Sequence, residues 1–72
     1  MFIMYTMDGC VFCQKAIEYI QNHLKEKVEL RNVKIKEHFE TIQRVLPNET
    51  TVPQIFYNNR HVGGYNDLVR DF

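Results

Sequence analysis

The spacing of the two cysteines constrains this chain more than any other feature. Cys10 and Cys13 are the only cysteines among 72 residues. A domain of this length buries only about 60% of the surface that its unfolded chain exposes, and small extracellular domains commonly compensate with several disulfides. A disulfide between residues three apart closes too short a loop to stabilise the whole fold. The pair therefore indicates thiols that cycle in an intracellular, cytoplasmic protein, whose single domain over residues 1–72 depends on its apolar core.

Apolar periodicity in the first half of the chain predicts a strand, a helix and a second strand. Residues 2–5 form a short apolar run, typical of a buried strand, and residues 28–33 begin with the alternation of a second one. A helix should start between them, at or just before Cys10. Apolar residues recur there at helical spacing, namely at Cys13, Ala16, Ile17, Ile20 and Leu24.

The second half predicts a helix, a hairpin and a last helix. Phe39, Ile42, Val45 and Leu46 mark the first of these, which should stop at Pro47. Residues 54–57 and 60–62 form a hairpin across Asn58-Asn59, because asparagine tolerates the left-handed backbone of a tight turn.

Gly63-Gly64 predicts a bend, after which Asn66 or Asp67 caps a short helix toward Phe72. The resulting order, β-α-β-α-β-β-α, predicts an α/β fold with one four-stranded mixed sheet flanked by helices. We expect most aromatic residues at core or half-core positions, namely Phe2, Tyr5, Tyr19, Phe39 and Phe56.

The position of the cysteine pair suits thiol chemistry. Cys10 and Cys13 fall between the first strand and the first helix, where one helical turn brings two thiols within disulfide range. The partial positive charge and the free N–H groups of a helix N-terminus favour thiolate over thiol. Cys10 is therefore the expected nucleophile, and Cys13, deeper on the apolar stripe, is the expected resolving thiol.

Two other interpretations of the pair remain open at this point. A C-x-x-C is half of a structural zinc site, but the three histidines, His23, His38 and His61, lie on separate elements without ligand spacing. The cysteines could also be inert core residues, although Gly9 and the helix start place Cys10 at an exposed end. We expect no metal, and we expect each histidine to be a surface residue.

Charge and hydropathy exclude other classes of partner. Nine Lys and Arg residues balance nine Asp and Glu residues, and no segment accumulates basic charge. The sequence therefore argues against nucleic acid or an anionic membrane as the main partner. Residues 1–8 lack the basic region and the long apolar region of a signal peptide, and no stretch approaches the roughly 18 apolar residues of a membrane span.

Three separated motifs resemble the glutaredoxin family. Residues 10–13 (CVFC) resemble its C-P-Y-C motif, residues 51–56 (TVPQIF) match its T-V-P-Q-I-F segment, and residues 63–68 (GGYNDL) are similar to its G-G-Y-x-D-L/F bend. Their order and spacing also fit, over nearly the whole chain. The resemblance implies a thioredoxin-like fold with Pro53 in cis, facing the cysteine pair.

The resemblance also implies an activity and a binding site. The family reduces protein disulfides and glutathione mixed disulfides, and it takes part in electron transport and cell redox homeostasis. The resemblance implies that Cys10 and Cys13 are the catalytic residues of this chain. Glutathione is then the co-substrate, paired with the backbone of Val52, and Asp67 binds its α-ammonium. The glutathione-binding residues carried over from the family are Phe12, Thr51, Val52, Pro53, Gly64, Asn66 and Asp67.

The chain departs from the family pattern near the first cysteine. The family commonly has Lys or Arg three residues before it, where this chain has Met7 followed by Asp8, and Val11 replaces the proline of the motif. A basic or amide residue on the second helix often completes the glutathione site, and Arg44 is the nearest candidate.

Two other functions stay open alongside the glutathione-dependent enzyme. One is a redoxin recharged by thioredoxin reductase that donates electrons to ribonucleotide reductase. The other is a carrier of a [2Fe–2S] cluster ligated by glutathione. The partners that we expect are glutathione and disulfide-containing client proteins, and we expect a monomer.

Overall fold

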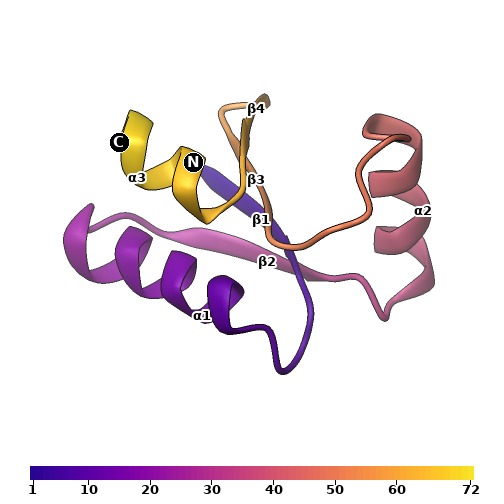
Figure 1. The fold of residues 1–72 in the computed structure, drawn as a ribbon, viewed down its shortest axis with the longest axis horizontal. Helices are drawn as coiled ribbons and strands as arrows, with labels where there is room; N and C mark the ends of the chain where they lie inside the picture. Colours follow the sequence, from indigo (N-terminus) through magenta and orange to yellow (C-terminus); the bar gives the residue numbers. More distant parts are fainter.

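The computed structural model describes residues 1–72 and has a four-stranded mixed sheet at its centre (Figure 1). The strands are β1 (Phe2–Thr6), β2 (Val28–Asn32), β3 (Gln54–Tyr57) and β4 (Arg60–Gly63). They lie in the order β2-β1-β3-β4; β1 is parallel to β2 and antiparallel to β3, and β3 is antiparallel to β4. The predicted α/β fold with a mixed sheet is confirmed.

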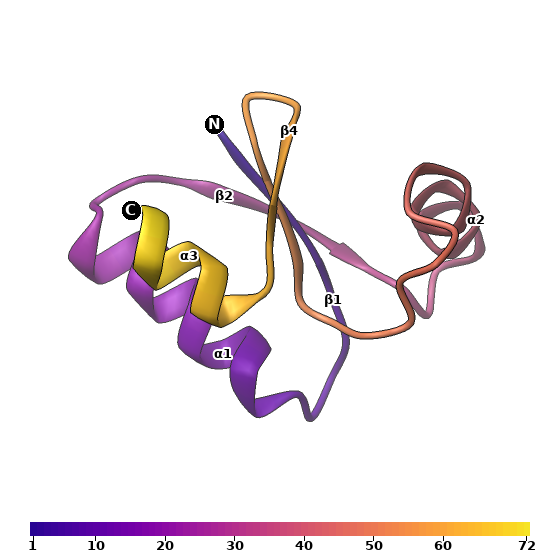
Figure 2. The ribbon, with the colours of Figure 1, turned by 45° about the horizontal axis from the view of Figure 1, so that its top comes forward.

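Three helices cover the sheet, in the predicted order. They are α1 (Val11–Glu18), α2 (Lys36–Val45) and α3 (Tyr65–Asp71), and a π-helical segment, η1 (Tyr19–His23), extends α1. Figure 2 shows α1 and α3 side by side, with α2 far from both on the other side of the strands. No helix in the chain is long and apolar enough to span a membrane.

The main core lies between the sheet and the pair α1 and α3. Side chains alternate along a strand, so Phe2 and Met4 of β1 point to the same face and contact the helices. The fully buried members of this core are Phe2, Met4, Ala16, Ile20, Ile55 and Leu68. Ile17 and Leu24, from the predicted apolar stripe, pack against it and are partly buried. The core thus fixes α1, and with it the cysteine pair, against the sheet.

Helix α2 covers only one end of the opposite face of the sheet. Ile42 is its single buried residue, whereas Phe39 is 46% exposed and Val45 is 51% exposed. The prediction of a core or half-core position for Phe39 is therefore wrong. Because the helix rests on the sheet over a short contact, the apolar side chains that flank Ile42 stay on the surface.

The turns follow the predicted chemistry. Asn58 and Asn59 have φ angles of 48° and 69° and join β3 to β4, so the predicted hairpin is confirmed. Gly63 has a φ of 122°, a conformation that side chains disfavour. A Cβ at this position would also overlap the carboxylate of Asp67. Glycine is therefore required where β4 turns into α3.

Two helix starts differ by one to three residues from the prediction. Helix α1 begins at Val11, and Cys10 is its N-cap residue with extended backbone angles. Helix α3 begins at Tyr65 with Gly64 as its N-cap residue, so Asp67, one of the two predicted caps, caps the helix from its third position and does not occupy the N-cap itself. Asp67 still stabilises the helix start, since its carboxylate accepts a hydrogen bond from the Gly64 N–H, 2.9 Å away.

Candidate active site

The cysteine pair lies at the start of α1 as a disulfide. The Cα atoms of Cys10 and Cys13 are 5.2 Å apart. Cys10 is half-buried, while Cys13 is completely buried against the core. The structure therefore makes one sulfur of the pair accessible to a substrate and shields the other.

Backbone groups surround the accessible sulfur. The N–H of Cys13 donates a hydrogen bond to Cys10 Sγ at 3.2 Å, so the sulfur caps the helix. The carbonyl oxygen of Val52 lies 3.7 Å from the same sulfur. A disulfide sulfur carries no proton, so this contact becomes a hydrogen bond only when Cys10 is a thiol. The helix N-terminus supplies the partial positive charge that favours the thiolate.

The loop that carries Val52 is held in place by hydrogen bonds of the Gln54 side chain. The Val52–Pro53 peptide bond is cis, as the resemblance predicted. Gln54 is buried, and its Nε2 donates to the carbonyl oxygen of Thr51 at 3.0 Å. Its Oε1 lies 2.8 Å from the Nε2 of His61. These contacts tie residues 51–53 to the hairpin and keep the Val52 carbonyl oxygen beside the cysteine pair.

A pocket of about 210 Å³ contains all the residues that the sequence predicted to bind glutathione. Helix α1, the loop around Pro53 and the start of α3 all contribute to it. The lining residues are Phe12, Thr51, Val52, Pro53, Gly64, Tyr65, Asn66 and Asp67. Tyr65 is the one lining residue outside the predicted set, although it belongs to the GGY motif. Its ring centroid lies 6.0 Å from that of Phe12.

Asp67 is the acidic group of this pocket, and it already has partners. Besides the Gly64 N–H, its carboxylate contacts the guanidinium of Arg70 at 3.0 Å. The hydrogen bond from Gly64, followed by that from Arg70, holds the pKa of Asp67 below its usual value. The carboxylate is therefore anionic and fixed in direction before any ligand binds.

The residues that depart from the family pattern, Met7, Asp8 and Val11, do not line the pocket that contains Asp67. Met7 is 42% exposed and lines a second pocket that includes Thr51 and Val52. Asp8 does not act as a free negative charge, because Lys34 lies 3.6 Å and the side-chain amide of Asn32 lies 3.2 Å from its carboxylate. The candidate Arg44 lines neither pocket, whereas its neighbour Gln43 lines the second one.

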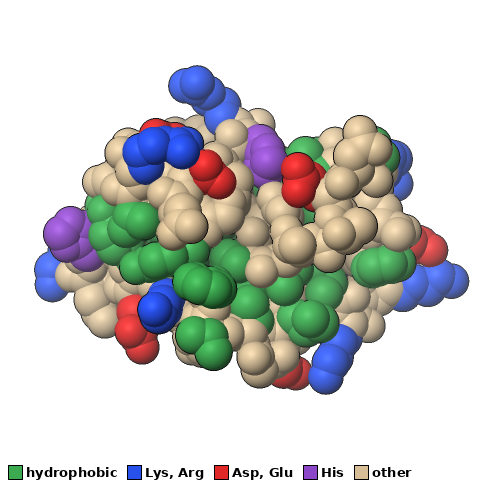
Figure 3. Space-filling view, in the orientation of Figure 1, with side chains coloured by type: hydrophobic (Ala, Val, Ile, Leu, Met, Phe, Trp, Pro, Cys, Tyr) green, Lys and Arg blue, Asp and Glu red, His purple; other side chains and the backbone are tan.

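The surface around the start of α1 is unusually apolar. Val11 is 66% exposed and Phe12 is 52% exposed. In Figure 3, hydrophobic side chains form a band across the face that carries the start of α1 and part of α2. Lys15 lies over the ring of Phe12, 5.4 Å from its centroid, and places a cation beside this band.

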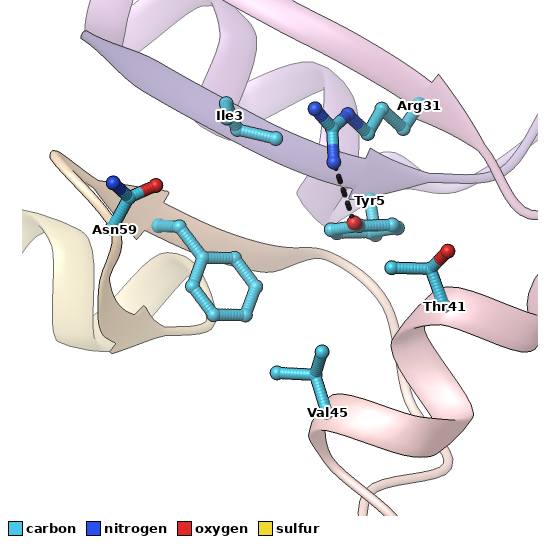
Figure 4. A pocket seen from close by; sticks show the side chains of 7 residues that line it. Ile3, Tyr5, Arg31, Thr41, Val45 and Asn59 are labelled. Carbon is cyan, nitrogen blue, oxygen red and sulfur yellow. Dashed lines mark hydrogen bonds between the residues drawn. The ribbon is translucent and has the colours of Figure 1, made fainter. Parts of the chain in front are cut away.

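A further hollow, of about 270 Å³, lies on the α2 side of the sheet and shares no residue with the pocket beside the cysteines (Figure 4). Arg31 lines it and donates to the hydroxyl oxygen of Tyr5 at 2.8 Å. It also contacts Glu29 at 2.6 Å. The hydrogen bonds to Glu29 and Tyr5 raise the pKa of Arg31 above its usual value. Because both partners occupy its guanidinium, we place the reaction site at the cysteines and not here.

Comparisons with known proteins agree with this geometry. The sequence model of the Glutaredoxin family matches residues 2–62. Glutaredoxin 1 of Rickettsia prowazekii is 38% identical over 68 residues, a region that covers 92% of this chain and 70% of that protein. The chain spans 64% of the Rickettsia typhi counterpart.

Solved structures show the same fold. Glutaredoxin 1 from Francisella tularensis, complexed with cacodylate, superposes with a TM-score of 0.78 at 21% identity, covering 97% of this chain and 88% of that one. A buckwheat glutaredoxin–glutathione complex superposes with a TM-score of 0.77 at 18% identity, and the match covers 97% of this chain and 66% of that one. Together with the matched family model and the disulfide at the start of α1, these likenesses show that the chain belongs to the glutaredoxin family of thiol–disulfide oxidoreductases.

Proposed function

We propose that this chain uses glutathione to reduce protein disulfides and glutathione mixed disulfides. The observation that carries the proposal is the placement of Cys10, whose half-buried sulfur caps α1 at the side of a pocket that holds all seven predicted glutathione residues. The buckwheat relative, solved as a glutaredoxin–glutathione complex, supports the same ligand class.

The reaction begins with Cys10 as a thiolate. In a mixed disulfide between a client and glutathione, the thiolate attacks the glutathione sulfur and forms a Cys10–glutathione disulfide. The client leaves as a thiolate, which takes a proton from water. A second glutathione thiolate then attacks the glutathione sulfur of this adduct. It releases glutathione disulfide and restores the Cys10 thiolate.

Protein disulfides follow a dithiol route. Attack by Cys10 gives a mixed disulfide with the client and frees one client thiol. Cys13 then loses its proton and attacks Cys10 Sγ, which expels the second client thiolate and leaves the Cys10–Cys13 disulfide. Two electrons pass to the client, and two glutathione molecules restore the dithiol. The burial of Cys13 supports this order, because external disulfides reach Cys10 first.

The pocket favours one orientation of glutathione. Val52 has no backbone hydrogen bond within the chain, so its N–H and C=O can pair with an extended ligand as an added strand would. The fixed carboxylate of Asp67 then faces the α-ammonium of the γ-glutamyl end. Phe12 and Tyr65 supply an apolar wall beside the ligand.

Single replacements of the two cysteines test the proposal. Cys10→Ser should abolish all disulfide reduction, whereas Cys13→Ser should keep deglutathionylation and lose dithiol activity. Mass spectrometry after treatment with oxidised glutathione should find one adduct on the Cys13→Ser protein and none on Cys10→Ser. An adduct that depends on Cys13 would reverse the assigned roles.

Coupled assays test the electron donor. We propose recharging by glutathione and glutathione reductase, in a monomer that works in the cytoplasm on disulfide-containing clients, of which ribonucleotide reductase is one candidate. Turnover of a glutathione mixed disulfide with NADPH and glutathione reductase supports the proposal. Turnover that requires thioredoxin reductase instead would contradict it.

A further inference from the structure

A second pocket adjoins the pocket that contains Asp67. It has a volume of about 250 Å³ and includes Thr51 and Val52, which also line the pocket beside Asp67. The Val52 carbonyl oxygen, 3.7 Å from Cys10 Sγ, thus belongs to a residue that lines both pockets. A ligand attached to Cys10 can extend into both.

The second pocket has an apolar lining and no cation. Met7, Phe39 and Ile42 supply much of its apolar surface, and Glu49 is its single charged residue. Met7 and Phe39 are 42% and 46% exposed, so a partner would remove a large apolar area from water there. Methionine also adapts its shape to different apolar groups. A ligand carboxylate, by contrast, would meet the like charge of Glu49 without a compensating base.

The course of the chain sets which part of a ligand reaches this pocket. Residues 49 and 50 line only the apolar pocket, residues 51 and 52 line both, and residue 53 lines only the pocket beside Asp67, so residues 49–53 run from the first pocket to the second. The buried side chain of Gln54 also reaches the apolar pocket. A strand pairing antiparallel with Val52 runs the other way. Its residues before the reacting cysteine lie near Asp67, and the residue after that cysteine lies over Met7 and Phe39.

We propose that this pocket receives an apolar side chain from a polypeptide client, contributed by the residue that follows the client's reacting cysteine. This inference rests on the proposed function, because it assumes attack by Cys10 on a client disulfide. The apolar pocket would then favour protein disulfides followed by leucine-like residues over those followed by small polar or acidic residues. It also gives Met7 a role as a specificity-determining residue.

Peptide substrates that differ at one position test the inference. Two peptides, each joined as a disulfide dimer through its only cysteine, carry Leu or Ser directly after that cysteine, so that Cys10 forms its mixed disulfide with the peptide itself. We expect kcat/KM to be about fivefold to tenfold higher for the Leu peptide, the gain from burying most of one aliphatic side chain. Phe39→Ala should bring this ratio close to one.

A matched variant and a small substrate separate the possible results. Val45→Ala shortens another half-exposed apolar residue of α2 that lies outside this pocket, and it should leave the ratio unchanged. A wild-type ratio near one, or an equal loss of the ratio in both variants, would overturn the inference. Reduction of hydroxyethyl disulfide by the wild type with glutathione would show that the enzyme is active. In that case either result would overturn the role of the apolar pocket and leave the proposed function standing. No turnover of any substrate would overturn the proposed function as well.

Discussion

Replacing Met7 with lysine should lower the pKa of the Cys10 thiol and raise the affinity for glutathione. Met7 lines the pocket that includes Val52, whose carbonyl oxygen lies 3.7 Å from Cys10 Sγ. An ammonium group at about 7 Å from the sulfur, with an effective dielectric constant of roughly 40, stabilises the thiolate by about 1.2 kcal/mol. That free energy corresponds to just under one pKa unit.

Salt reduces this effect in a predictable way. At physiological ionic strength the Debye length is about 8 Å, so the shift in pKa should fall to roughly half its low-salt value. A lower pKa also makes the thiolate a weaker nucleophile. The rate constant for attack should therefore rise less than the thiolate population does.

A pH titration of thiolate ultraviolet absorbance measures the shift. The Cys13→Ser background leaves Cys10 as the single titrating thiol, and Met7→Gln controls for the loss of the methionine side chain without adding charge. A pKa in Met7→Lys that equals or exceeds the Met7→Gln value would refute the reasoning. It would mean that the side chain of residue 7 points away from the thiolate.

The remaining predictions concern the start of α3 and the core beneath it. Asp67→Ala should raise the KM for glutathione and lower the melting temperature, because the carboxylate both faces the proposed ligand and accepts the Gly64 N–H. Asp67→Asn, which keeps a side-chain oxygen, should recover more of the melting temperature than of the KM. The folded-state pKa of Asp67 lies below its ordinary value of 3.8, so its stabilisation is complete above that pH and disappears as the pH falls through the folded-state pKa. The melting temperatures of the wild type and Asp67→Ala should therefore converge in acid. Gly63→Ala should cost about 1–3 kcal/mol in urea unfolding, because it combines an unfavourable φ with overlap on Asp67. Leu68→Ala should lower the free energy of unfolding by about 2–5 kcal/mol in the same assay, because Leu68 is fully buried in the core. The Cys10 thiolate should still react with iodoacetamide in the folded, reduced protein. A loss below about 1 kcal/mol would contradict the assignment of Leu68 to the core.

Local sequence patterns predicted most of the fold because each one reports a local physical requirement. The stripe through Ala16 and Ile20 predicted the face of α1 that is buried, and the asparagine pair predicted the hairpin turn. The caps were harder to predict, since a side chain can stabilise a helix start from the third helical position as well as from the N-cap. Asp67 does so, and the glycine before the helix supplies the N–H.

The exposure of Phe39 and the pocket that it shares with Met7 could not be predicted from local patterns. The two residues are 32 positions apart and lie on elements whose contact depends on how far α2 extends over the sheet. The family motifs predicted the residues of the pocket beside Asp67 because all of these residues fall within the three short motifs. The apolar pocket combines three residues of the TVPQIF motif with residues from several other elements, and no motif includes Met7 or Phe39.

The hydrogen bond between the Cys13 amide and Cys10 Sγ makes the backbone sensitive to the state of the sulfur. A thiolate accepts a hydrogen bond more strongly than a disulfide sulfur does, because it carries a full negative charge. The amide proton of Cys13 should therefore resonate at lower field and exchange more slowly with solvent when Cys10 is ionised. One backbone resonance in a ¹⁵N-labelled sample would then follow the redox state, the glutathione adduct and the ionisation of the reactive sulfur, with no probe attached to the sulfur itself.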